Sequence, residues 1–78
     1  MPTMITLKEH LLDIRRRLDQ AGIDDARLVA EMLAAHALGC ERGDLLGRAG
    51  QSLDGPSAER LEGLVARRLK HEPLEYIT

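Results

Sequence analysis

Aromatic residues are almost missing from this chain, which has no Trp, no Phe and a single Tyr at position 76. Strands are enriched in aromatic and β-branched side chains, whereas the apolar residues here are mostly Leu and Ala, which favour helices. The composition therefore argues against a sheet-based domain. It predicts an all-α fold, and a length of 78 residues is enough for one small domain.

Cysteine and long apolar runs are scarce too. Cys40 is the only cysteine, so an internal disulfide is excluded, and His10, His36 and His71 stand on separate predicted elements without the spacing of a zinc site. Residues 1–6 lack the basic and apolar segments of a signal peptide, and no apolar stretch approaches the roughly 20 residues that cross a bilayer. We expect a cytoplasmic protein without a membrane or metal partner.

Strong charge of one sign is likewise missing. The formal net charge is −2, although 31% of the residues are charged. Such a balance gives solubility without the basic field typical of nucleic-acid binders, so it argues against nucleic acid as the main partner.

The most apolar stretch runs from position 24 to 39, and ten of the fourteen residues from 25 to 38 are apolar. This density predicts a helix at 25–38 that needs partners on two sides. Asp24 or Asp25 can accept hydrogen bonds from the first-turn amides, and Gly39 can adopt the left-handed conformation that ends a helix. The two predicted buried strips are Leu28, Met32, Ala35 and Leu38, and beside them Val29, Leu33 and Ala37.

A helix at about 7–21 is predicted before it. Thr6 and Glu9 have the spacing of a capping box, while Gly22 followed by Ile23 is typical of a glycine cap with a hydrophobic contact. Its core-facing stripe is predicted to be Leu7, Leu11, Ile14 and Leu18, with Leu12 beside it.

Two further helices are predicted after the central one. A short helix at 42–46 would close the end of the core with Leu45 and Leu46, and the following loop would turn Leu53 inward. Asp54 then caps a helix at about 55–70, and Pro73 breaks it at residue 72. These elements form a bundle of four to five helices, including a short turn at 73–77.

Basic residues gather near the ends of the first and last helices. Three consecutive helical positions, Arg15 to Arg17, span about 200° of the helix surface, and cations near a helix C-terminus are favourable anyway. A solvated face is therefore one interpretation. If the two helix ends meet, a patch for an acidic partner or a phosphate is the other. The candidate partner-binding residues are Arg15, Arg16, Arg67, Arg68 and Lys70.

No pattern in the sequence indicates catalysis. The acidic pairs Asp24/Asp25 and Glu59/Glu62 lie in or near first helical turns, where negative charge is favourable. Arg27 and Glu31 have the spacing of an intrahelical ion pair, although Glu31 could also pair with an Arg from another helix. A nucleophile elbow, a phosphate-binding glycine loop and an acidic metal cluster are all missing, so we predict no catalytic, cofactor-binding or metal residue.

Three blocks resemble a known family. DARLVAEMLAAHALG at 25–39, RGDLL at 42–46, and Arg67-Arg68 leading to EPLEYIT at 72–78 are similar to the N-terminal domain of the HemK/PrmC family, the bacterial release factor glutamine methyltransferases. The resemblance covers nearly the whole chain from the first helix onward. Its most specific part is the Glu-Pro-Leu-x-Tyr-Ile ending.

The resemblance implies a helical domain at 1–71 and, from 72–78, the start of a hinge that includes Glu72, Pro73 and Tyr76. Beyond the hinge, such enzymes have a catalytic domain that binds S-adenosylmethionine and methylates the Gly-Gly-Gln glutamine of class I release factors. The family's cofactor and substrate motifs do not occur in this sequence. The implied role is to dock and orient the release factor, and we expect the isolated domain to be a monomer.

Two departures from the family pattern bear on the predicted structure. His71 stands where the family usually has Gly, which weakens the prediction of a left-handed helix cap there, and Gly43 stands where Thr is commoner. Two alternatives remain open at this level. One is a helix-turn-helix nucleic-acid binder, and the other is an oligomerisation module that pairs Leu74, Tyr76 and Ile77 between chains.

Overall fold

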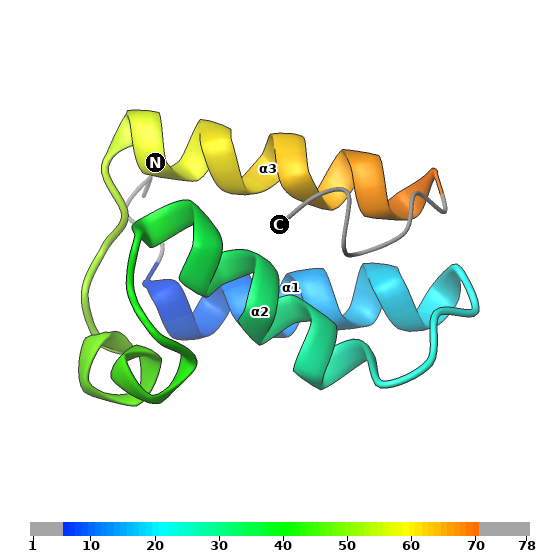
Figure 1. Cartoon of the computed structure of the whole chain (residues 1–78), viewed down its shortest axis with the longest axis horizontal. Coiled ribbons are helices and arrows are strands. Elements are labelled where there is room, and N and C mark those ends of the chain that lie inside the picture. The colour runs from blue at the N-terminus through cyan, green and yellow to red at the C-terminus, as the bar shows by residue number, and fades with distance from the viewer. Residues whose placement is uncertain (1–5, 71–78) are drawn as a thin grey trace.

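A computed structural model describes residues 6–70, which form three α-helices and a 3-10 helix (Figure 1). The elements are α1 (Leu7–Gln20), α2 (Ala26–Leu38), η1 (Arg42–Arg48) and α3 (Gly55–Leu69). Within this range the only extended pairing is an isolated bridge between Thr6 and Ser52. The all-α prediction is confirmed, whereas the turn at 73–77 and the hinge at 72–78 lie outside the described residues.

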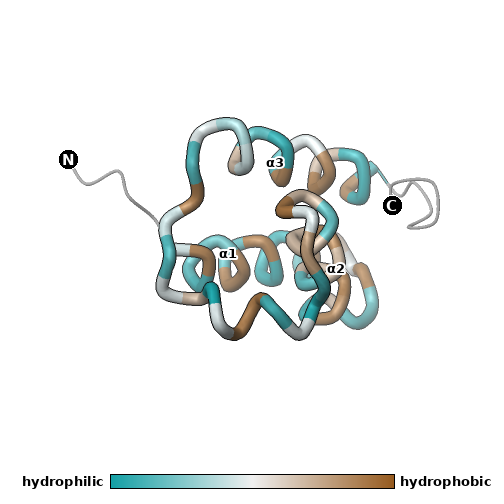
Figure 2. The backbone as a smooth tube through the Cα atoms, turned by 60° about the vertical axis from the view of Figure 1, so that its left-hand side comes forward, coloured by the Kyte–Doolittle hydropathy of each residue, from teal (hydrophilic) through white to brown (hydrophobic). Residues whose placement is uncertain are grey.

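Helix α2 is the centre of the bundle. It packs against α1, α3 and η1, while α1 and α3 run in the same direction on either side of it (Figures 1 and 2). Its buried residues are Ala26, Val29, Ala30, Leu33, Ala34, Ala35 and Ala37. The prediction of a central helix with partners on two sides is confirmed.

The predicted rotation of α2 is wrong in part. Leu28 is 38% exposed, and Met32 and Leu38 are only half-buried, whereas Ala30 and Ala34 are buried. Small side chains let neighbouring helices approach closely, so the alanines take the centre of the contact. A helix with apolar residues around much of its surface gives little sequence signal for which side lies deepest.

The two ends of α2 differ in how well the sequence predicts them. Gly39 has a φ of 70°, as predicted for a left-handed cap. Asp25 also adopts a left-handed conformation, with a φ of 55°, and its side chain makes no capping hydrogen bond. The predicted acidic cap is therefore wrong. The connection from α1 to α2 is short, and Asp is among the few non-glycine residues that tolerate this conformation.

The caps of α1 and α3 follow the local sequence. The Glu9 N–H donates to Thr6 Oγ1 at 3.3 Å, and the Thr6 N–H donates to Glu9 Oε1 at 3.0 Å. After α1, Gly22 has a φ of 79° and the buried Ile23 donates its N–H to the Leu18 carbonyl at 3.0 Å. The capping box and the glycine cap are both confirmed.

The cap of α3 predicts a dependence of stability on pH. The Ser57 N–H donates to Asp54 Oδ1 at 2.7 Å, and this bond lowers the pKa of the Asp54 carboxyl below its ordinary value of 3.8. A carboxyl with a lowered folded-state pKa stabilises the fold above its unfolded-state pKa, and the contribution is lost as the pH falls through the folded-state pKa. We expect the stability advantage of the wild type over Asp54→Asn, measured by urea denaturation, to shrink as the pH falls below 3.8. An advantage that does not change with pH would contradict this assignment.

The short helix η1 differs from its prediction in kind and in what it buries. It is a 3-10 helix over Arg42–Arg48, in which Leu45 is 4% exposed and Leu46 is 86% exposed. With three residues per turn, neighbouring side chains point about 120° apart, so two consecutive leucines cannot both face the core. The prediction is right for Leu45 and wrong for Leu46.

The chain after η1 returns to the start of α1. The Leu7 N–H donates to the Gln51 carbonyl at 2.8 Å, and the Lys8 N–H donates to the Ala49 carbonyl at 3.0 Å. Leu53 is half-buried and packs against the core, which confirms its predicted inward turn. These bonds hold η1 beside α1 and α2, where the three elements enclose a groove.

Candidate functional site

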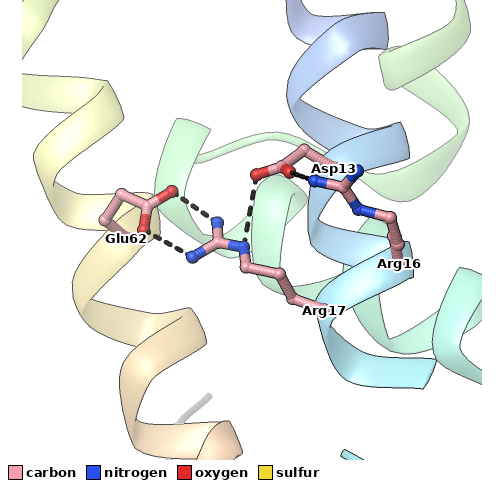
Figure 3. A network of polar contacts seen from close by, with 4 residues as sticks. All are labelled: Asp13, Arg16, Arg17 and Glu62. Carbon is pink, nitrogen blue, oxygen red and sulfur yellow. Dashed lines mark hydrogen bonds and ion pairs between the residues drawn. The ribbon is translucent and has the colours of Figure 1, made fainter. Parts of the chain in front are cut away.

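The first candidate surface is the end of the bundle at which both α1 and α3 finish (Figure 1). Arg17 of α1 reaches across to Glu62 of α3, with Nη1 to Oε1 at 3.1 Å and Nη2 to Oε2 at 2.7 Å. Its Nε also lies 3.2 Å from Asp13 Oδ2 (Figure 3). The hydrogen bonds to Glu62 raise the pKa of the Arg17 guanidinium. Arg17 therefore ties α1 to α3, and the interpretation of the arginine run as a solvated face is wrong for this residue.

The other two arginines of the run point elsewhere. Arg16 is exposed and pairs with Asp13 at 2.7 Å (Figure 3). Arg15 lies about 200° around the helix from Arg17, and it lines the groove between α1, α2 and η1 instead. Arg15 therefore lies on a different side of α1 from Arg17, which faces α3.

The last turn of α3 carries the remaining predicted residues. Arg67 and Lys70 are exposed and Arg68 is half-buried. A second contact holds this helix to α2, because Arg60 Nη1 donates to the carbonyl of Ala37 at 2.6 Å. We define the basic end as Arg67, Arg68 and Lys70, the cations at the C-terminal end of α3. Arg16 pairs with Asp13 on the side of α1 that points away from α3 (Figure 3), so it is not part of this set.

The second candidate surface was not predicted from the sequence. It is a groove of about 480 Å³ between α1, α2 and η1, and none of its lining residues comes from α3. Leu11 and Leu12 of α1 and Leu45 and Leu46 of η1 contribute most of its large apolar side chains. The only sequence signal for it is the pair of leucines, Leu12 and Leu46, that the core does not use.

The rim of the groove is positively charged. Four cations, Lys8, Arg15, Arg27 and Arg42, line it together with one carboxylate, that of Glu31. Glu31 lies 3.2 Å from Arg27 Nε and 3.3 Å from Arg42 Nε. Both predicted partners of Glu31, the intrahelical Arg and an Arg from another element, are therefore present. One carboxylate against four cations leaves a formal excess of three positive charges at the groove.

The described residues offer little for catalysis. No group of three or more His, Cys, Asp or Glu side chains within residues 6–70 could hold a metal ion, and Cys40 is a free, half-buried thiol. None of the helices in that range combines the length and apolarity needed to cross a bilayer. What the arrangement can do chemically is bind an acidic or apolar surface.

Comparison with known proteins supplies the family. Residues 9–78 match the model of the PrmC N-terminal domain. The chain is 38% identical over 76 residues to a release factor glutamine methyltransferase of Geobacter sulfurreducens. It is 43% identical over 63 residues to one of Mycolicibacterium smegmatis, and 37% identical over 73 residues to a bifunctional methyltransferase of Rickettsia conorii.

These matches cover most of this chain and a small part of each relative. The match covers 97% of this chain and 27% of the Geobacter sulfurreducens protein. For the Mycolicibacterium smegmatis protein the two shares are 77% and 21%, and for the Rickettsia conorii protein they are 94% and 14%. No solved structure matches significantly. The resemblance carried by 25–39, 42–46 and 67–78 is confirmed, and the chain belongs to the PrmC N-terminal domain family.

Proposed function

We propose that this chain is the non-catalytic, substrate-holding domain of a release factor glutamine methyltransferase. In this role it helps to dock a class I release factor and to orient its Gly-Gly-Gln glutamine toward a catalytic domain further along the protein. The observation that carries the proposal is the family match over residues 9–78, joined to a domain whose two candidate surfaces are both basic. A protein substrate with acidic patches would be attracted to such surfaces.

The basic end is the first docking surface in this proposal. Its cations Arg67, Arg68 and Lys70 lie just before residues 71–78 in the chain, so a protein held here would be close to the start of the proposed hinge at Glu72, Pro73 and Tyr76. The bonds of Arg17 to Glu62 and of Arg60 to Ala37 hold α3 to its neighbours. Residues on a braced helix orient a partner more narrowly than residues on a loop.

S-adenosylmethionine does not fit the residues described. The four cations of the groove would repel the positively charged sulfonium of this cofactor. Its single carboxylate, Glu31, is already shared by two arginines, so no free acidic group remains there for ribose hydroxyls. In this proposal the cofactor binds to the catalytic domain, and this chain takes no part in methyl transfer itself.

No feature of the described residues favours either alternative, the helix-turn-helix nucleic-acid binder or the oligomerisation module. A helix-turn-helix protein inserts a recognition helix into the major groove, whereas α2 is buried between its neighbours and η1 is a short 3-10 helix. The residues proposed for oligomerisation, Leu74, Tyr76 and Ile77, lie outside the described range. The expectation of a monomer remains a prediction that sedimentation can check.

A competition assay tests the proposed function. The 78-residue chain is added to release factor methylation by the Geobacter sulfurreducens enzyme, and initial rates are measured against release factor concentration. We expect the chain to raise the apparent KM for release factor and to leave kcat unchanged. A docking surface shared between two domains loses the benefit of linked binding when one is absent, so half-maximal inhibition should need roughly 0.1 to 1 mM chain.

Two matched variants and one ligand control sharpen the assay. Lys70→Glu reverses a charge at the basic end and should weaken the inhibition. Arg48→Glu makes a comparable charge change in η1, which lies at the opposite end of the bundle from the last turn of α3 (Figure 1), and it should leave the inhibition unchanged. Calorimetry should show no saturable binding of S-adenosylmethionine to the chain. Wild-type chain that does not inhibit at several times this concentration would refute the docking role.

A further inference from the structure

The groove concentrates the apolar surface that the fold leaves uncovered. Within the part of the chain that the structure describes, Leu12, Leu28 and Leu46 are the exposed large hydrophobic residues, at 55%, 38% and 86%. Two of them, Leu12 and Leu46, line the groove from different elements, with the buried Leu45 beside them. Apolar side chains that gather in one hollow indicate a contact surface, whereas scattered ones do not.

The α1 wall of the groove has a regular pattern. Its four lining residues, Lys8, Leu11, Leu12 and Arg15, occupy positions i, i+3, i+4 and i+7, which form one face of a helix. Two leucines therefore lie between two cations about 10 Å apart along the axis. Such a stripe on a surface helix complements a second helix with apolar residues at its centre and acidic residues on either side.

Two of the four cations at the groove are available to a partner. Arg27 and Arg42 share Glu31, but neither Lys8 nor Arg15 makes an ion pair with any residue between 6 and 70. Two cations without local partners beside leucines favour carboxylates as the incoming charge. A nucleic acid backbone would meet the cations but would leave the leucines uncovered, so the mixture of groups indicates a protein.

We propose that the groove between α1, α2 and η1 binds an acidic amphipathic helix of the release factor. This inference rests on the proposed function and adds to it a second docking surface, with the chemistry of the segment that the surface takes. The helix places large apolar side chains against Leu12 and Leu46, and it places carboxylates beside Lys8 and Arg15 at the rim. None of the residues that line the groove comes from α3, so in this proposal the groove and the basic end are separate surfaces that hold different parts of the substrate.

The first test removes the apolar contacts. Purified release factor is titrated into the 78-residue chain, and the dissociation constant is measured for the wild type, for Leu12→Gln with Leu46→Gln, and for Leu28→Gln. Leu28 is the matched control because it is exposed but does not line the groove. We expect the double variant to bind about tenfold more weakly and the control to bind like the wild type. Circular dichroism melting checks that both variants remain folded.

The second test reverses the charge at the rim. Arg15→Glu should weaken release factor binding, and raising the salt concentration should weaken wild-type binding by screening the same attraction. Arg48→Glu is the control, because Arg48 is exposed and does not line the groove. Equal losses for Arg15→Glu and Arg48→Glu would mean that only the overall charge matters, and the proposed groove contact would be wrong.

The outcomes separate this inference from the proposed function. If the groove variants bind like the wild type while Lys70→Glu weakens binding, the groove proposal is refuted and the docking role stands. If the wild-type chain neither binds release factor nor inhibits its methylation, both are refuted. Occupation of the groove by a second copy, by residues 72–78 of the same chain or by RNA would also refute it. A second copy would appear as a dimer that the double variant does not form. Residues 72–78 would appear as tighter binding of release factor after truncation at residue 71. RNA would appear as an RNA affinity that Arg15→Glu abolishes.

Discussion

Replacing Leu33 by Ala is expected to lower the free energy of unfolding by about 2 to 5 kcal/mol. Leu33 is fully buried in α2, the helix that packs against all three other elements. The substitution removes apolar contacts and leaves a cavity in the hydrophobic core that residues 6–70 form. Small domains have a total stability of roughly 5 to 15 kcal/mol, so urea denaturation should show a large loss or an unfolded chain.

Leu28→Ala is the matched control on the same helix. It deletes the same atoms from a side chain that is 38% exposed, so its cost should be well below that of Leu33→Ala. Equal costs at the two positions would contradict the observed rotation of α2. Wild-type stability in Leu33→Ala would place that residue outside the core.

Enlarging the small residues of α2 is the second substitution with a large expected effect. Ala34 is fully buried, and Ala34→Leu adds three carbon atoms where the helix contacts its neighbours. Overpacking a well-packed core costs typically about 1 to 3 kcal/mol. The melting temperature of the variant should therefore fall, as measured by circular dichroism.

The control for Ala34→Leu is Ala66→Leu, which makes the same change at an exposed position of α3. Leu and Ala differ little in helix propensity, so this variant should melt close to the wild type. A tolerated Ala34→Leu would mean that the alanines of α2 are not in close contact with the other helices.

The ends of the helices were largely predictable because their signals are local. Thr6 with Glu9, and Gly22 with Ile23, act within a few residues of the chain, and the hydrogen bonds they predict are present. Asp25 is the exception. Its left-handed conformation is imposed by the short turn between two packed helices, and tertiary packing of this kind has no local signal.

The side-chain contacts between different helices were less predictable. The sequence could not indicate that Arg17 meets Glu62 while Arg15 turns away, because that depends on where α3 lies relative to α1. The same is true of the groove, which exists only because the 3-10 geometry of η1 points Leu46 outward beside Leu12. Residues from α1, α2 and η1 build it, and the stretch at 8–15 contains the pattern of one wall alone.

The functional conclusion combines a family with two surfaces. The match over residues 9–78 shows the family, and the proposed docking role rests on that match together with the basic charge of the two surfaces. Both surfaces depend on α2, since it holds α1, η1 and α3 in their relative positions. If α2 were not the stable centre, neither the groove nor the basic end would present a fixed arrangement to a substrate.

Native-state hydrogen exchange of the 78-residue chain tests this central claim most directly. The amides of α2 from Ala30 to Ala37, which include four fully or almost fully buried residues, Ala30, Leu33, Ala34 and Ala37, should exchange most slowly. Their opening free energy should equal the free energy of global unfolding from denaturation. Exchange from α2 that is faster than exchange from both α1 and α3 would contradict the account.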